Sequence, residues 1–298
     1  MRFLLYGSKG WIGEFFLGLL ADHHDIEVVI GKSRVDNEQE LEREILTVKP
    51  THVISTIGRT HGEGYTTIDY LEQKGKIFEN VRDNLFSPLV LAILSEKYNF
   101  HFTYLATGCI YQYDETHPYE QEINGFDDDE KPNFFGSSYS TVKSYTDRLM
   151  GYFDSVLTLK IRMPIVDTPN GRNFITKIVN YEKICSIKNS MSVLDDLLEI
   201  MIDMIKHNQT GRFNFTNPGL ISHNEILEMY REIVDPTFTW VNFTQDEQNT
   251  ILAAGRSNNY LDTSKLEAYC QGRHINLLPI KESVRQVLIR MKENIDSV

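Results

Sequence analysis

The chain has 298 residues, of which 41% are hydrophobic and 24% charged, a composition typical of a soluble globular protein with one or two domains. Its formal net charge of -12 disfavours nucleic acids and anionic membranes as partners. The three cysteines (Cys109, Cys185 and Cys270) fit neither a disulfide framework nor a zinc spacing, so no metal site is expected. The apolar run before Gly7 is too short for a signal peptide, and no stretch is long enough to span a membrane. A cytoplasmic protein is therefore expected.

Strand and helix patterns alternate along the first half of the chain. Short apolar runs predict strands over residues 3–6, 26–30, 52–57, 102–107 and 156–161. Helical patterns lie between them, over residues 11–20, 37–46, 77–98 and 139–152. Pro88 is expected to bend the third of these helices. The alternation predicts an α/β fold, a Rossmann-like doubly wound parallel sheet.

The second half, from about Met163, has a less regular pattern. It predicts helices near residues 174–181, 194–207 and 224–234, a terminal helix from Ile280, and a strand over 213–216 that returns to the main sheet. The predicted domains are therefore interleaved. A Rossmann domain is expected over residues 1–165 plus about 190–218, and a smaller substrate-binding domain over about 166–189 plus 219–298.

A glycine-rich loop follows the first strand and opens the first helix. Its spacing is G-x-x-G-x-x-G, with Gly7, Gly10 and Gly13. Gly7 permits a tight turn, and the later glycines allow close backbone approach and helix packing, so that the helix N-terminus faces a pyrophosphate. The alternative is a strand-helix turn without a ligand. The predicted dinucleotide contacts here are Gly7, Lys9, Gly10, Trp11, Ile12 and Gly13.

The end of the second strand indicates which dinucleotide is bound. Lys32, Ser33 and Arg34 follow the strand, where NAD-binding proteins carry an acid for the ribose 2′-hydroxyl. Both cations suit the 2′-phosphate of NADP, which favours NADPH, with NADH as the alternative. Solvated loop charges are the other interpretation, since Asp36 lies nearby. Thr56, near the end of the third strand, and Met163, after the fifth, complete the predicted cofactor contacts.

Tyr139 and Lys143 stand four residues apart in a predicted helix, so phenol and ammonium share one face. A lysine beside a phenol favours the phenolate and lowers the phenol pKa, which suits Tyr139 to general acid-base chemistry near neutrality. Thr107 ends the fourth predicted strand. These groups are what the reduction of a ketone requires.

The glycine loop, Thr107, Tyr139 and Lys143 together resemble the extended short-chain dehydrogenase/reductase superfamily. Longer strings narrow this resemblance to the plant-type UDP-4-keto-6-deoxy-glucose 3,5-epimerase/4-reductases, which form UDP-L-rhamnose and have relatives in large DNA viruses. The strings are Tyr104-Leu-Ala-Thr-Gly-Cys-Ile-Tyr111, Pro132-Asn-Phe134, Arg172-Asn-Phe-Ile-Thr-Lys177, Asn214-Phe-Thr-Asn-Pro-Gly219 and Arg256-Ser-Asn-Asn259.

The resemblance implies a role for each residue of a 4-keto-reductase. Tyr139 is the acid, Lys143 binds the nicotinamide ribose, and Thr107 orients the carbonyl. Met163 borders the nicotinamide. The predicted substrate contacts are Asn133, Asn173 and Arg256, the last two at the diphosphate. For Arg256 a surface ion pair is the alternative. The superfamily also implies a homodimer through the helices of residues 77–98 and 139–152, and a separate 4,6-dehydratase that supplies the substrate.

Epimerisation needs two more groups, because protons on C3 and C5 must be removed and returned on opposite faces. Cys109 lies two residues after Thr107, and a thiol near cations can act as the base. The resemblance places Lys177 in the second position, where fucose-forming relatives have a histidine. The alternatives are a packing role for Cys109 and a solvated helix charge for Lys177.

Two other functions remain open from the sequence. A reductase without epimerase activity would not need Cys109 or Lys177. A non-catalytic nucleotide-binding subunit would not need Thr107, Tyr139 and Lys143 together. The sequence does not distinguish a UDP from a dTDP carrier.

Overall fold

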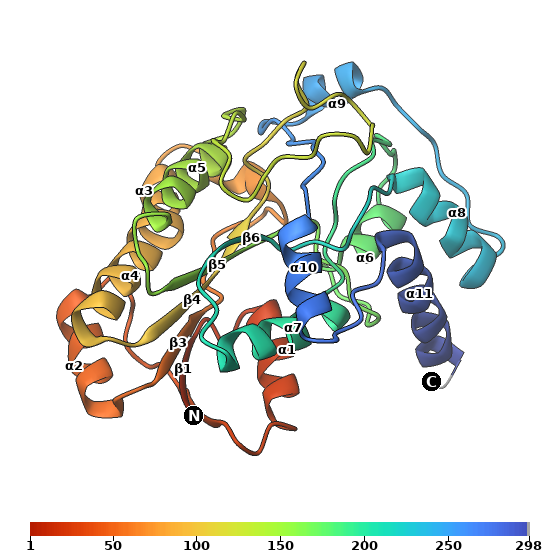
Figure 1. The fold of residues 1–298 in the computed structure, drawn as a ribbon. Coiled ribbons are helices and arrows are strands. Elements are labelled where there is room, and N and C mark those ends of the chain that lie inside the picture. Colours follow the sequence, from red (N-terminus) through yellow and green to blue (C-terminus); the bar gives the residue numbers. More distant parts are fainter. Residues whose placement is uncertain (297–298) are drawn as a thin grey trace. The chain divides into compact units, whose positions relative to one another are not determined.

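The structure, a computed structural model, describes residues 1–296 and divides the chain into two compact units (Figure 1). The first unit is made of Met1–Ile110, Phe134–Lys160 and Met201–Phe213. The second unit is made of Tyr111–Asn133, Ile161–Ile200 and Asn214–Val298. The chain therefore passes between the units several times, as interleaved domains require.

The unit boundaries differ from the predicted ones at residues 111–133. These residues belong to the second unit, because they bond to residues 258–262 through their backbone: Tyr113 N–H donates to the Asn258 carbonyl at 3.0 Å, and Phe126 N–H to the Tyr260 carbonyl at 2.9 Å. Residues 161–165, 190–200 and 214–218 also belong to the second unit, whereas the prediction placed them in the Rossmann domain. Residues 297 and 298, where the predicted second domain ends, lie outside the described residues.

The first unit is built around a six-stranded sheet with strand order β2-β1-β3-β4-β5-β6. Its strands are β1 (Arg2–Tyr6), β2 (Glu27–Ile30), β3 (His52–Ser55), β4 (His101–Thr107), β5 (Val156–Ile161) and β6 (Gly211–Asn214). β1 pairs in parallel with β2 and β3, and β3 pairs in parallel with β4. The parallel Rossmann-like sheet is confirmed, and the predicted returning strand is β6. The strand order reverses between β1 and β3, and open α/β sheets bind ligands at the carboxyl ends of the strands at such a point.

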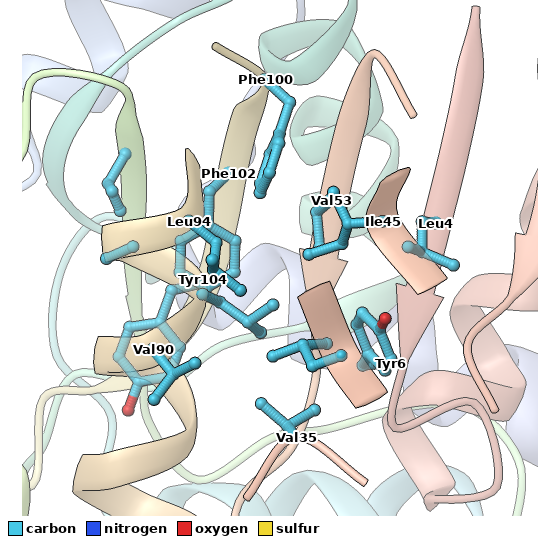
Figure 2. Packing of buried hydrophobic residues seen from close by; sticks show 14 of the residues in the cluster. Leu4, Tyr6, Val35, Ile45, Val53, Val90, Leu94, Phe100, Phe102 and Tyr104 are labelled. Carbon is cyan, nitrogen blue, oxygen red and sulfur yellow. The ribbon is translucent and has the colours of Figure 1, made fainter. Parts of the chain in front are cut away.

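Helices cover both faces of this sheet (Figure 1). They are α1 (Trp11–Leu20), α2 (Glu38–Val48), α3 (Ile77–Val81), α4 (Ser87–Tyr98) and α5 (Ser138–Met150), with short helices η1 (Ile68–Glu72) and η2 (Arg82–Phe86). Figure 1 shows α2 to α5 on one face and α1 on the other. The face under α2 and α4 is mostly apolar: Leu4, Val53 and Phe102 of the sheet are 0% exposed and pack with Ile45 and Leu94 (Figure 2). The burial of these apolar side chains is the main contribution to the stability of the unit.

The predicted helix over residues 77–98 is interrupted, but not by a bend at Pro88. A π-helical turn, η2, separates α3 from α4, and Ser87 Oγ donates to the Arg82 carbonyl at 2.9 Å across it. Pro88 lies in the first turn of α4, where a proline needs no hydrogen-bond donor. The π turn therefore precedes the proline, and π turns of this kind are frequent at functional sites.

The second unit contains α6 (Phe174–Val179), α8 (His223–Ile233), α9 (Gln245–Ile251), α10 (Ser264–Gly272) and α11 (Ile280–Asp296), while α7 (Leu194–Lys206) runs from the second unit into the first. Buried apolar residues of α6, α8 and α11 form one core, with Ile178, Leu227 and Leu288 at 0% exposure. The prediction missed η1, α9 and α10. Within residues 1–296, no helix combines the length and the hydropathy that a membrane span requires.

Candidate active site

The glycine loop joins β1 to α1 as predicted and leaves no room for side chains. Gly7 has a φ of +86°, and a Cβ there would lie 2.6 Å from Thr56 Oγ1. A Cβ on Gly13 would lie 2.1 Å from the Gly7 carbonyl oxygen. Gly10 N–H donates to that same carbonyl at 2.9 Å and closes the turn. The close approach of backbone to backbone explains why glycine is required at Gly7 and Gly13.

The N-terminus of α1 is suited to an anion. Gly10 is the N-cap residue, so no side chain caps the first backbone N–H groups of the helix. Those groups and the helix dipole favour a phosphate at this position. Trp11 and Ile12 lie in the first turn, Lys9 is exposed beside it, and Thr56 donates its backbone N–H to the Tyr6 carbonyl at 3.1 Å. The predicted loop residues therefore surround one helix end that fits a dinucleotide pyrophosphate.

The segment after β2 is held by an acid that the sequence did not reveal. Glu44 of α2 accepts the backbone N–H of Lys32 at 2.8 Å, that of Ser33 at 2.9 Å, and the Tyr6 hydroxyl at 2.8 Å. Burial raises the pKa of Glu44, but the backbone bonds from Lys32 and Ser33 outweigh it and leave that pKa below its ordinary value. Arg34 is 65% exposed and pairs with Asp36 at 3.0 Å. The segment is thus fixed by its backbone, which leaves the Lys32 and Arg34 side chains at its surface.

A second contact missed by the sequence fixes the loop after β3. Asn84, in the π turn, is fully buried; its Oδ1 accepts the Arg59 N–H at 2.9 Å and its Nδ2 donates to the Arg59 carbonyl at 2.9 Å. Arg59 Nε also donates to Asp83 at 2.9 Å. The π turn therefore orients the Asn84 side chain toward the backbone of this loop.

Thr107, Cys109, Tyr139 and Lys143 come together in the first unit. Thr107 ends β4, and its Oγ1 accepts the Cys109 N–H at 3.1 Å. Tyr139 and Lys143 lie on α5, whose N-cap Ser137 accepts the Ser140 N–H at 3.0 Å. Tyr139 forms a hydrogen bond with Thr107 and packs with Cys109. The structure thus brings together four predicted residues from two distant segments, and Cys109 lies beside Tyr139.

The pKa of Tyr139 differs from the prediction. Burial raises it above its ordinary value, the charge of Cys109 raises it further, and only the hydrogen bond with Thr107 lowers it. The prediction that Lys143 lowers this pKa is wrong for this structure, because the Lys143 ammonium donates to the hydroxyl of Tyr104 instead. Burial lowers the pKa of Lys143 to about 7, against the upward effect of Cys109 and Asp147. Tyr139 therefore keeps its proton at neutral pH, while Lys143 can exchange its own.

Lys177 lies on α6 of the second unit among other cations. Burial lowers its pKa, and the positive charges of Arg172 and then Arg256 lower it further. This supports the prediction of a lysine tuned toward neutral pH by desolvation. Arg172 was not predicted as a site residue, although it stands next to Asn173 in the sequence. Three clustered cations are suited to a polyanionic ligand.

Two of the predicted substrate contacts have their side chains engaged within the protein. Asn173 is fully buried as the N-cap of α6, and its Nδ2 donates to the carbonyls of Val166 at 2.8 Å and Thr168 at 3.0 Å. Asn133 Nδ2 donates to the Gln112 carbonyl at 3.0 Å and to Asp114 at 2.8 Å, while its Oδ1 accepts the Gln112 N–H. With both amide hydrogens of each side chain in use, neither is free to donate to a diphosphate.

Arg256 and Met163 are the remaining predicted residues, and both lie in the second unit. Arg256 is partly buried, and its Nη1 donates to the Ala254 carbonyl at 2.7 Å. Met163, shortly after β5, has a φ of 41°, which is unusual for a residue with a Cβ. Such backbone strain is concentrated at functional sites.

No model of a known protein family matches the chain, but individual relatives with reductase and epimerase names do. An uncharacterized protein L780 of Acanthamoeba polyphaga mimivirus is 52% identical over 98% of this chain and 99% of its own length. A crystal structure described as the L780 UDP-rhamnose synthase of that virus superposes with a TM-score of 0.93, covering 97% of this chain and 99% of that one.

Plant relatives match over nearly the same length. An Arabidopsis thaliana bifunctional dTDP-4-dehydrorhamnose 3,5-epimerase/dTDP-4-dehydrorhamnose reductase is 45% identical over 95% of this chain and 91% of its own length. An Arabidopsis trifunctional dehydratase/epimerase/reductase is also 45% identical, and the chain spans 41% of it. A Clostridium acetobutylicum dTDP-4-dehydrorhamnose reductase, 16% identical with a TM-score of 0.77, shares the fold. The chain belongs to the extended short-chain dehydrogenase/reductase superfamily, in the family of the rhamnose-forming 3,5-epimerase/4-reductases.

Proposed function

We propose that the protein is a bifunctional 3,5-epimerase and NADPH-dependent 4-keto-reductase that converts UDP-4-keto-6-deoxy-D-glucose to UDP-L-rhamnose. The names of the viral and plant relatives support both activities. The observation that carries the proposal is the grouping of Thr107, Cys109, Tyr139 and Lys143. A reductase alone would need three of these residues, and Cys109 adds a group that can remove a proton.

The cofactor proposal rests on the glycine loop and on the segment after β2. A bound NADPH supplies the hydride for C4. The N-terminus of α1 would hold the pyrophosphate, and the side chains of Lys32 and Arg34 would meet the 2′-phosphate. Glu44 is engaged by the backbone of the segment, so it is not offered to a ribose 2′-hydroxyl. NADPH is therefore proposed over NADH.

In the reduction, Tyr139 gives its proton to the C4 oxygen as C4 accepts the hydride. The raised pKa of Tyr139 keeps the phenol protonated until negative charge develops on that oxygen. Thr107 donates a second hydrogen bond to the same oxygen. Lys143 holds the nicotinamide ribose and can return a proton to Tyr139, since the lowered pKa of Lys143 permits exchange near neutrality.

In the epimerisation, the protons on C3 and C5 are acidic because the C4 carbonyl stabilises the resulting enolate. We propose that the Cys109 thiolate removes a proton on one face and that Lys177 delivers a proton on the other. Thr107 and Tyr139 would stabilise the enolate oxygen by hydrogen bonds. Lys177 suits the role of acid because its pKa is lowered by burial and by Arg172 and Arg256. The bond to carbon is re-formed by the returned proton, so no redox change accompanies this step.

For the diphosphate we propose Arg172 and Arg256. Their charges act on Lys177, which places the three cations in one electrostatic cluster. Asn173, whose amide hydrogens bond the backbone of Val166 and Thr168, is proposed to position Arg172 and not to bind the ligand itself. Asn133 is likewise proposed to shape the segment of Gln112 and Asp114.

The proposal is tested by proton NMR of the protein with UDP-4-keto-6-deoxy-D-glucose in deuterated water, with and without NADPH. We expect deuterium to enter C3 and C5 without NADPH, and UDP-L-rhamnose to appear once NADPH is added. Cys109→Ala should abolish the exchange and leave NADPH binding intact. Cys185→Ala is the matched control, since Cys185 is a buried free thiol elsewhere. Reduction without exchange would leave a simple 4-keto-reductase, and neither event would indicate a binding subunit.

We also propose that the protein acts as a homodimer supplied by a separate 4,6-dehydratase. The support for a dimer is an exposed apolar surface on α3, α4 and α5. Its residues and their exposed fractions are Ile77 (53%), Phe78 (71%), Ile93 (48%), Tyr145 (60%) and the nearby Tyr152 (77%). Apolar surface of this kind marks interaction sites. Sedimentation should give a dimer that Phe78→Asp converts to a monomer.

A further inference from the structure

The Lys143 side chain does not extend freely along α5 but ends at a residue for which the sequence predicted no role. Its ammonium donates to the hydroxyl of Tyr104, a residue of β4. Tyr104 is 1% exposed and Lys143 is 4% exposed. Figure 2 shows the Tyr104 ring held within the apolar cluster between α4 and the sheet. Because that cluster fixes the ring, the hydroxyl is a rigid partner for a flexible side chain.

The charged and titratable groups around this pair come from α5, β5, β6 and the segment after β4. Cys109, after β4, and Asp147, one turn beyond Lys143 on α5, both favour the charged form of Lys143. Asp147 is shared with Arg212 of β6, whose Nη1 lies 3.3 Å away, and with Lys160 of β5 at 4.0 Å. Burial raises the pKa of Tyr104 well above its ordinary value, and the charges of Tyr139 and Asp147 raise it further. Tyr104 therefore stays protonated while Lys143 exchanges its proton.

A hydroxyl can serve either charge state of an amine. It accepts a hydrogen bond from an ammonium, and it donates one to a neutral amine. A carboxylate or a backbone carbonyl can only accept, so it could not donate to the lone pair that the lysine gains when it gives up its proton. The hydroxyl of Tyr104 keeps the contact in both states, at a site where both side chains are buried.

We propose that Tyr104 is a positioning residue of the reduction, which holds Lys143 in place both as an ammonium and as a neutral amine. The inference rests on the proposed reductase function. In that function Tyr139 gives its proton to the C4 oxygen and is left as a phenolate. Lys143 then returns a proton to the phenolate, becomes a neutral amine, and regains a proton from solvent. Tyr104 itself gains and loses no proton.

The test is Tyr104→Phe in the complete protein, assayed with NADPH and the 4-keto sugar across pH. The change keeps the ring, whose centroid lies 4.8 Å from the Lys143 Nζ, and removes only the hydroxyl. The ammonium loses more from this than the neutral amine, so the pKa of Lys143 should fall. We expect the pH limb of kcat that reports Lys143 to move down by about one unit, with about a tenfold loss of kcat above that limb.

The matched control is Tyr111→Phe. Tyr111 is also fully buried, and its hydroxyl donates to the Glu130 carbonyl at 3.1 Å, a bond in which no lysine takes part. It should leave the pH profile in place. If Tyr104→Phe does not fold, replacement of Tyr104 by 3-fluorotyrosine tests the same effect on the pH limb of Lys143. Fluorination makes the hydroxyl a weaker acceptor and should move the limb in the same direction by a smaller amount.

The outcomes separate this inference from the proposed function. An active Tyr104→Phe protein with the wild-type pH profile would overturn the inference, as would an equal shift in Tyr111→Phe. Lys143→Met should abolish reduction at every pH. If Lys143→Met remains active, the proposed role of Lys143 fails and the inference fails with it. If Lys143→Met is inactive while Tyr104→Phe and the fluorinated protein match the wild type, only the inference fails.

Discussion

Glu44 offers a sharp test of how the cofactor segment is held. Glu44→Gln keeps the size of the side chain but replaces one carboxylate oxygen by an N–H donor. Three donors converge on this carboxylate: the backbone N–H groups of Lys32 and Ser33 and the hydroxyl of Tyr6, at 2.8 to 2.9 Å. A glutamine oxygen can still accept two of them, but its nitrogen faces the remaining donor. The segment of Lys32, Ser33 and Arg34 should therefore loosen.

The magnitude follows from the number of bonds changed. The substitution removes the charge from three hydrogen bonds and leaves one donor facing another donor. A hydrogen bond to a charged group contributes about 1.5 to 3 kcal/mol, and the bond from Lys32 is exposed to solvent. We expect a loss of about 2 kcal/mol in the free energy of unfolding. If the segment positions the 2′-phosphate contacts, the KM for NADPH should rise about tenfold while kcat changes little.

The assay is urea denaturation together with steady-state kinetics in NADPH and in NADH. Glu40→Gln is the control, because Glu40 is an exposed residue one turn earlier on α2 and loses the same charge. It should shift stability by a few tenths of a kcal/mol. A Glu44→Gln protein as stable as the control would refute the reasoning about the carboxylate. Equal rises in KM for NADPH and NADH would show that the segment does not serve the 2′-phosphate.

Two further predictions concern pH. Arg172→Met should raise the pKa of Lys177, because the positive charge of Arg172 is one of the causes that lower this pKa. The pH profile of deuterium exchange should therefore move to higher pH. An unchanged profile would show that Lys177 does not limit the exchange. Burial, and then His101, lower the pKa of His52 to about 4 from an ordinary 6.5. The unfolded chain therefore binds this proton before the folded protein does, so stability is complete above about pH 6.5 and falls toward pH 4, by about 3 kcal/mol. Urea denaturation from pH 7 to 4.5 should show a smaller loss of unfolding free energy in His52→Gln than in the wild type. Equal losses in both proteins would contradict the assignment of this pH dependence to His52.

The catalytic arrangement could be predicted where it depends on local spacing. Tyr139 and Lys143 share a helix face because of the four-residue interval, and Gly7 needs its positive φ because of the turn after β1. The break in the helix over 77–98 was expected at Pro88 because proline is visible in the sequence. A π turn has no such signal, since it depends on how Asn84 meets the loop of Arg59.

The missed elements, η1, α9 and α10, were short, with five to nine residues each. Helix α9 contains no buried residue, so it has no apolar period to detect, although Thr244 and Glu247 form a capping box that could have been found. The substrate contacts were carried over from a resemblance, and only the hydrogen bonds show that Asn133 and Asn173 spend both amide hydrogens within the protein.

The sequence by itself determined the alternation of strands and helices, the glycine loop and the family, because these depend on residue type and on intervals of a few residues. Only the tertiary structure decided which groups surround each of these residues. Tyr104 and Asp147 set the environment of Lys143, and Glu44 holds the segment of Lys32. The physical reason is that pKa values and hydrogen-bond partners depend on burial and on neighbours far apart in the chain, which no short interval in a sequence records.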